Sequence, residues 1–146
     1  MNEMLIKTVD DWKKLAREIA PSLTSGTVLA LSGHLGAGKT TFVQALAEIL
    51  GAKGSPRSPT FSLVRTYKLK TANDKLTRLV HVDAYRIERA EDLLPLNLDE
   101  ELAEPGTILV LEWPENAVSW IKKQLSMFTI KIELGENEER TVRLLP

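Results

Sequence analysis

The stretch that decides the fold of this 146-residue chain reads GHLGAGKTT and runs from Gly33 to Thr41. It contains the phosphate-loop pattern G-x-x-x-x-G-K-[ST], whose fixed positions are filled by Gly33, Gly38, Lys39 and Thr40. Glycines let consecutive backbone N–H groups turn inward around an anion, the lysine reaches the outer phosphates, and the threonine hydroxyl can bind magnesium. The pattern therefore predicts a nucleoside triphosphate and a metal ion at this loop, provided that the flanking segments have the right structure.

Both segments beside the loop match what a phosphate loop requires. TVLALS (27–32) is a β-branched and aliphatic run typical of a buried strand, and TFVQALAEIL (41–50) has helical periodicity and stops at Gly51. Strand, glycine loop and helix thus follow one another in the expected order. We therefore predict a nucleotide site rather than an ordinary glycine-rich turn between a strand and a helix.

Length and composition are those of one soluble globular domain, 1–146, with 43% hydrophobic and 27% charged residues. The absence of cysteine excludes disulfide and thiolate chemistry. The sequence has no signal-peptide core and no apolar run of membrane-spanning length, so we expect a cytoplasmic protein. The net charge of −1 argues against non-specific nucleic-acid binding as the main activity.

The charges are nevertheless unevenly distributed along the chain. Residues 53–78 hold seven bases and one acid, whereas residues 83–115 hold ten acids and only Arg86 and Arg89 as bases. Two solvated surfaces of opposite sign would explain this asymmetry, and so would a surface for RNA or a protein partner beside the nucleotide site. Both interpretations stay open from the sequence.

The N-terminal segment predicts a strand over 4–8 followed by a helix. Thr8 and Asp11 form a capping-box pattern, apolar residues then recur at helical spacing, and Pro21 marks the end. Trp12 is expected to anchor this helix in the core. A place in the wall of a base pocket is the alternative.

The loop after the phosphate-loop helix, residues 51–60, is rich in Gly, Ser and Pro, which disfavour helix and regular strand. It carries Ser58, Pro59 and Thr60, and the two hydroxyls could meet the terminal phosphate or the metal. Its position resembles that of a switch loop, while a plain surface connection is the alternative.

Two later strands are predicted to end in acids. Runs 61–69 and 75–84 predict an antiparallel hairpin whose second strand ends at Asp83, and 107–113 predicts an apolar strand ending at Glu112. In this kind of fold the carboxyl ends of buried strands carry the ligands of the metal. The sequence thus predicts two carboxylates at the edge of the sheet where the phosphate loop lies.

The remaining segments complete the fold prediction. Residues 84–106 predict short helices, Pro114 starts a helix over 115–125, and 127–134 pairs with 139–145 in a second hairpin. We therefore predict an α/β fold: a single-domain P-loop NTPase whose mixed central sheet is flanked by helices and carries antiparallel hairpins.

Phosphoryl transfer requires a cradled triphosphate, neutralised charge and an oriented nucleophile. Lys39 and Thr40 supply the first two, and Asp83 and Glu112 are available to bind the metal and to position the attacking water. Which acid does which stays open. His81 shares a face with Asp83 and is expected to be a packed strand residue rather than a catalytic base.

Four stretches, in this order and spacing, resemble the TsaE (YjeE) family: GHLGAGKTTF (33–42), SPRSPTFSLVRTY (55–67), HVDAYR (81–86) and LVLEWPE (109–115). Its members are small bacterial ATPases required to form threonylcarbamoyladenosine next to the anticodon of tRNAs. The resemblance covers nearly the whole chain, and the last three stretches are more specific than the phosphate loop.

The resemblance implies roles for particular residues of this chain. ATP is expected to be bound by Leu35, Gly36, Ala37, Gly38, Lys39, Thr40 and Thr41, with Thr8 near the adenine and Glu115 beside the nucleotide. Magnesium is expected on Thr40 and Glu112, with Asp83 as the second essential acid. Ser58, Pro59 and Thr60 would belong to a nucleotide-sensitive switch loop, and Trp113 matches the family tryptophan beside the site. His34 departs from the Asp that the family usually carries.

The resemblance also implies partners, namely the TsaD and TsaB proteins, with tRNA reached through their complex. Hydrolysis would drive or reset that complex, whereas the carbamoyl transfer belongs to TsaD. Arg57 and Arg86 are the nearby candidates for an arginine finger. The basic segment 65–78 is the candidate surface facing tRNA or a partner.

Three other functions share the phosphate loop. A small-molecule kinase would need a lid with several arginines and an acceptor-binding segment, for which this chain is short. A GTPase would need the N-K-x-D and D-x-x-G motifs, which the sequence lacks. A nucleotide-dependent adaptor with vestigial hydrolysis is disfavoured by the intact Lys39, Asp83 and Glu112.

Overall fold

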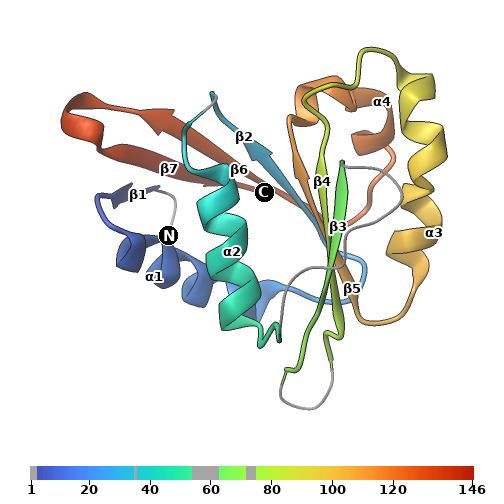
Figure 1. Ribbon diagram of the computed structural model, residues 1–146, viewed down its shortest axis with the longest axis horizontal. Coiled ribbons are helices and arrows are strands. Elements are labelled where there is room, and N and C mark those ends of the chain that lie inside the picture. Colours follow the sequence, from blue (N-terminus) through green and yellow to red (C-terminus); the bar gives the residue numbers. More distant parts are fainter. Residues whose placement is uncertain (1–2, 35, 54–62, 72–74) are drawn as a thin grey trace.

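A single seven-stranded sheet forms the centre of the protein (Figure 1). The structure, a computed structural model, describes residues 3–34, 36–53, 63–71 and 75–146. The strands are β1 (Glu3–Ile6), β2 (Val28–Ser32), β3 (Val64–Lys68), β4 (Arg78–Asp83), β5 (Thr107–Glu112), β6 (Met127–Leu134) and β7 (Arg140–Leu145). The α-helices are α1 (Val9–Ile19), α2 (Lys39–Ile49), α3 (Leu98–Ala103) and α4 (Val118–Ile121), and the 3₁₀ helices are η1 (Ala20–Ser22), η3 (Ala90–Leu96), η4 (Pro114–Asn116) and η5 (Glu136–Glu138).

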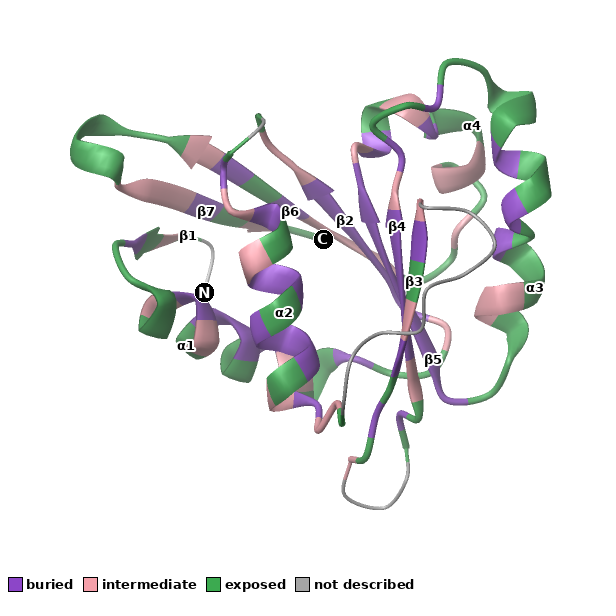
Figure 2. Ribbon diagram, viewed as in Figure 1, coloured by how far each residue is buried: buried purple, intermediate pink, exposed green. Residues whose placement is uncertain are grey.

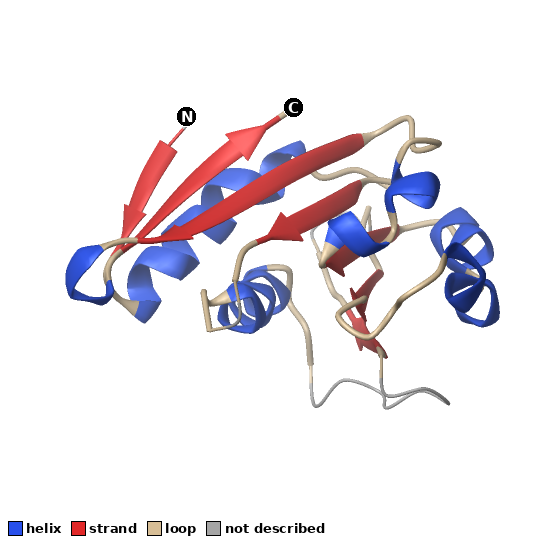
Figure 3. Ribbon diagram, turned by 90° about the horizontal axis from the view of Figure 1, so that it is seen from above, coloured by secondary structure: helices blue, strands red, loops and turns tan. Residues whose placement is uncertain are grey.

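The middle of the sheet is parallel and its margins are antiparallel. The strand order is β1-β7-β6-β2-β5-β4-β3. β2 runs parallel to β5 and β6, and β5 runs parallel to β4, whereas the pairs β3–β4, β6–β7 and β1–β7 are antiparallel. The predicted mixed sheet and both predicted hairpins are confirmed. The first and last strands, β1 and β7, lie side by side (Figure 3).

Helices cover the two faces of the central strands, so these strands are buried from both sides (Figure 2). β5 shows this directly, because its alternate residues enter two different cores. Ile108 and Val110 belong to the core under α1 and α2, while Leu109 and Leu111 belong to the core under η3 and α3. A strand buried on both faces reads as a continuous apolar run, which is what the sequence TILVLE shows.

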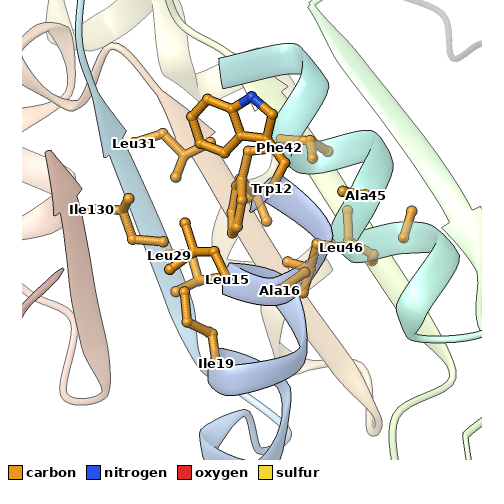
Figure 4. Close-up of a cluster of buried hydrophobic side chains, with 14 of the residues drawn as sticks. Trp12, Leu15, Ala16, Ile19, Leu29, Leu31, Phe42, Ala45, Leu46 and Ile130 are labelled. Carbon is orange, nitrogen blue, oxygen red and sulfur yellow. The ribbon is translucent and has the colours of Figure 1, made fainter. Parts of the chain in front are cut away.

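The first core joins the N-terminal helix to the phosphate-loop helix (Figure 4). Trp12 and Leu15 of α1 pack with Phe42 and Leu46 of α2 over Leu29 of β2. The Trp12 and Phe42 ring centroids lie 6.1 Å apart with the rings tilted. Trp12 is therefore the core anchor that its helical spacing predicted, and it ties α1 to the start of α2.

The local predictions around α1 and α2 are confirmed. Thr8 Oγ1 accepts a hydrogen bond from the Asp11 N–H at 3.3 Å, and Asp11 Oδ2 accepts one from the Thr8 N–H at 3.1 Å, which together make the capping box. α2 follows the phosphate loop directly, and the chain leaves it through Gly51 at a φ of +80°.

The helix predicted over 115–125 is confirmed only in part. The structure has only the short η4 and α4 there, separated by Ala117 at φ −134° and ψ 31°. The Asn116 side chain donates to the carbonyl oxygen of Ala84 at 2.9 Å, so a contact from another part of the chain holds the break. Short helices are confirmed within 84–106 as η3 and α3. Within the described residues, no helix combines the length and the apolarity needed to cross a membrane.

Candidate functional site

The phosphate loop connects the end of β2 to the first residue of α2. Gly36 and Gly38 adopt φ values of +77° and +108°, which side chains other than hydrogen rarely tolerate. The helix then begins at Lys39, so its first unpaired N–H groups face the loop. Leu35 lies outside the described residues. The backbone geometry at the two glycines is that of a turn able to wrap an anion.

Two predicted acids lie together beside this loop. In the parallel register of β4 and β5, Asp83 is the direct partner of Glu112, and Glu112 in turn pairs with Leu31 of β2. Three adjacent strands therefore end at one edge of the sheet, within reach of the loop that follows Ser32. The sequence prediction that these strand ends meet is confirmed.

Lys39 is almost fully buried although it carries a charge, with 5% of its surface exposed. Its Nζ donates to the carbonyl oxygen of Gly33 at 2.5 Å and lies 3.6 Å from the centre of a Trp113 ring. Burial lowers the pKa of Lys39 below its ordinary value, and the charges of Glu112, Glu115 and Asp83 oppose that effect. The ammonium group is thus held at the loop by one carbonyl and one aromatic face.

Glu112 has a buried partner that the sequence interpretation undervalued. His81 and Glu112 are 5% and 4% exposed, and His81 Nε2 lies 2.5 Å from Glu112 Oε2. When the Glu112 carboxylate is ionised it can only accept hydrogen bonds, and the pairing then requires His81 to donate from Nε2. His81 Nδ1 is the buried side-chain atom without a hydrogen-bond partner among the described residues. His81 is a packed strand residue, as predicted, and it also orients Glu112.

Trp113 adopts a conformation that is rare for a bulky residue. Its φ and ψ are 61° and 56°, in the left-handed region. The ring packs on Tyr85 with centroids 5.1 Å apart, and the Trp113 N–H donates to the carbonyl oxygen of Leu31 at 3.3 Å. The Tyr85 N–H donates to Asp83 Oδ1 at 3.0 Å. Such backbone strain is typical of functional sites, and Trp113 is held here by contacts from the ends of β2 and β4.

An open cavity of about 470 Å³ lies over the loop, a size that suits a nucleotide. It brings together nine predicted residues: Thr8, Gly36, Gly38, Lys39, Thr40, Thr41, Asp83, Glu112 and Trp113. It also includes Trp12, for which a place in the pocket wall was the alternative, and five residues that were not predicted as binding residues: Ile6, Lys7, Val9, Tyr85 and Arg140. Trp12 thus lines the cavity as well as anchoring the core, and Arg140 comes from the C-terminal hairpin, where no sequence pattern pointed to the site.

Other predicted residues lie elsewhere. Ala37 is buried at 2% exposure. Glu115 lines a second hollow of about 480 Å³ beside the loop, where Ser32 Oγ donates to its Oε2 at 3.4 Å. Arg86 is exposed and does not line the first cavity. Ser58, Pro59 and Thr60 lie outside the described residues, as does Arg57, so the switch loop stays a prediction.

The basic segment contains both exposed and engaged side chains. Arg78 Nη2 forms an ion pair with Glu101 Oε2 at 2.7 Å and also donates to the Glu101 carbonyl oxygen at 2.8 Å. Arg65, Lys68 and Lys70 are exposed. Arg78 therefore holds α3 against β4, and the candidate contact surface consists of the exposed bases.

Comparison with known proteins gives a consistent family match. A family model described as threonylcarbamoyl adenosine biosynthesis protein TsaE matches residues 6–142. A TsaE protein of Aquifex aeolicus is 36% identical over 99% of this chain and 96% of that protein, and one of Bacillus subtilis is 36% identical over 94% of this chain and 83% of that protein. The crystal structure of Bacillus subtilis YdiB superposes with a TM-score of 0.70 and 31% identity, covering 97% of this chain and 82% of that one.

Proposed function

The chain belongs to the TsaE family of threonylcarbamoyl adenosine biosynthesis proteins, and we propose that in this pathway it is a magnesium-dependent ATP hydrolase. The observation that carries the proposal is the register of β4 and β5, which sets Asp83 beside Glu112 at the edge where Lys39 and the phosphate loop lie. A lysine at the outer phosphates and two acids opposite it are the parts that phosphoryl transfer from a nucleotide requires.

The residues present suit a magnesium ion. Magnesium prefers hard oxygen ligands, and the cavity offers the Thr40 hydroxyl with the carboxylates of Asp83 and Glu112. His81 already engages Glu112 Oε2, which fixes the carboxylate in the cavity wall. We propose that Thr40 and Glu112 hold the ion, which would neutralise charge on the phosphate oxygens.

The protein's own residues would act on the nucleotide as follows. Backbone N–H groups of Gly38, Lys39 and Thr40 bind the phosphates at the start of α2. The Lys39 ammonium exchanges its contact with the Gly33 carbonyl for the outer phosphates, where a buried positive charge interacts strongly. Asp83 then orients the attacking water. Thr8, at the start of α1, lies on the same cavity and would approach the adenine.

We propose that hydrolysis drives or resets a complex of TsaB and TsaD, through which the protein acts on tRNA. The exposed bases Arg65, Lys68 and Lys70 support a partner- or tRNA-facing surface on the β3 side of the sheet. A role in tRNA modification suits a cytoplasmic location and a single ATPase unit spanning 1–146.

The test is ATP hydrolysis by the purified chain alone, with TsaB–TsaD, and with TsaB–TsaD plus tRNA. We expect slow turnover alone and faster turnover with the partners. Lys39→Ala should lose nucleotide binding, and Glu112→Ala should abolish turnover while the protein stays folded. Wild-type rates in either variant would reject the site, and a preference for GTP over ATP in competition would reject the nucleotide assignment.

A further inference from the structure

Arg140 joins the C-terminal hairpin to the phosphate loop. It is the first residue of β7, and its Nε donates to the Ala37 carbonyl oxygen at 2.9 Å across 103 residues of sequence. Its Nη2 donates to the Gly36 carbonyl oxygen at 3.1 Å, and its Nη1 donates to the Glu138 carbonyl oxygen at 2.6 Å. One guanidinium group therefore binds two consecutive carbonyls of the loop and one of its own hairpin.

These bonds control where two N–H groups of the loop point. A peptide unit is planar and trans, so its N–H points opposite to its C=O. Because the carbonyls of Gly36 and Ala37 point to Arg140, the N–H groups of Ala37 and Gly38 point the other way. The Ala37 N–H accordingly donates to the His34 carbonyl oxygen at 3.1 Å, which closes the turn. The orientation of the Gly38 N–H, one of the groups expected to bind phosphate, is set in the same manner.

The Arg140 side chain suits this task because its guanidinium group is a planar and rigid fork and its backbone is fixed within the sheet. The planar guanidinium presents parallel N–H donors, which match two adjacent acceptors in a way that a lysine ammonium cannot. The Arg140 backbone is paired on both sides, with Ile6 of β1 and Leu134 of β6. The sheet thus holds the fork in place, and the loop takes its shape from the sheet.

We propose that Arg140 is a positioning residue of the nucleotide site, which sets the conformation of the phosphate loop before the nucleotide binds. The inference rests on the proposed function in one respect, namely that this loop binds phosphate. The simplest alternative is that Arg140 contributes only a positive charge beside the cavity.

The test is ADP binding by isothermal titration calorimetry in the absence of magnesium, with Arg140→Lys, Arg140→Ala and the control Arg143→Ala. Arg143 lies on the same strand, and among the described residues its side chain makes an exposed ion pair with Glu3 at 3.4 Å. Loss of the fork should weaken ADP binding about tenfold or more in both Arg140 variants, because a hydrogen bond from a charged donor contributes on that scale. Arg143→Ala should bind as the wild type does.

Amide hydrogen exchange of the nucleotide-free protein supplies a second readout. Exchange at residues 36–38 should accelerate in Arg140→Lys and not in Arg143→Ala. Wild-type ADP affinity in Arg140→Lys would overturn the positioning role, because the positive charge of the side chain would then be sufficient. An equal loss of affinity in Arg143→Ala would also overturn it, because the effect would then come from disturbing the strand. If Arg140→Ala does not fold, Arg140→Lys decides. A wild-type protein that binds no adenine nucleotide would instead reject the proposed function.

Discussion

Gly38 is the position at which the phosphate loop touches the core, and its replacement by alanine gives the sharpest test of the loop geometry. A Cβ atom at Gly38 would lie 2.5 Å from Cζ2 of Trp12, a buried and rigid ring. Gly36 offers a matched control in the same loop. It also has positive φ, but a Cβ there would meet no atom of the described residues within 4 Å.

The two substitutions differ in one physical effect. Alanine at positive φ costs about 1–2 kcal/mol at either glycine. At Gly38 the collision with Trp12 adds overpacking, which costs about 1–3 kcal/mol more. For a chain of about this length, each kcal/mol of extra cost at Gly38 should lower the melting temperature of Gly38→Ala by about 2–4 °C relative to Gly36→Ala.

Urea unfolding of the two variants measures the difference directly, and repeating both in a Trp12→Phe background separates its causes. Phenylalanine lacks the Cζ2 atom, so the excess cost of Gly38→Ala over Gly36→Ala should shrink there, while the cost shared by both remains. Equal destabilisation of the two variants in both backgrounds would refute the reasoning. An excess at Gly38 that survives Trp12→Phe would assign it to backbone strain instead.

Three further predictions follow from the charged groups. Burial lowers the pKa of Lys39 from 10.5, so the charged side chain opposes folding at neutral pH. The wild type should therefore gain stability as the pH rises from the folded pKa of Lys39 toward 10.5, whereas Lys39→Met, which has no charge there, should not gain this stability. Urea unfolding of both proteins across this pH range should show the stability of Lys39→Met falling relative to that of the wild type. His81→Phe leaves the Glu112 carboxylate buried without its hydrogen-bond partner and should lower the free energy of unfolding by about 3 kcal/mol. In a double-mutant cycle with Glu112→Gln, the two losses of stability should be clearly less than additive, and additive losses would contradict the pairing. Charge reversal of Lys68 and Lys70, both exposed, should weaken binding to TsaB–TsaD or tRNA without lowering the melting temperature, and unchanged binding would reject this surface.

Short-range patterns in the sequence were sufficient for the elements that carry the site. The phosphate loop needs only glycines, a lysine and a threonine at fixed spacing, and the capping box needs only Thr8 and Asp11 three residues apart. The apolar runs that end at Asp83 and Glu112 predicted buried strands, and in a parallel sheet the carboxyl ends of such strands meet at one edge. These features are local or follow from strand direction, so they can be read without knowing the packing.

Only the tertiary structure decided which side chains complete the site. The hydrogen bond of His81 to Glu112 depends on the register between two strands 31 residues apart, and nothing in HVDAYR reveals it. The sequence grouped Arg78 with the other bases of a candidate surface, whereas in the structure its side chain forms an ion pair with Glu101 of α3. The helix predicted after Pro114 is interrupted at Ala117, next to Asn116, whose side chain hydrogen-bonds to the Ala84 carbonyl oxygen on another segment.

Arg140 shows the limit of sequence patterns most clearly. Its hairpin alternates in polarity like any antiparallel hairpin, and its own neighbours carry no motif. The contact with Gly36 and Ala37 exists because β7 folds back beside β1 and β6 and brings a rigid fork to the phosphate loop. Local sequence determined where the phosphate loop lies, and long-range packing determined that Arg140 contacts it.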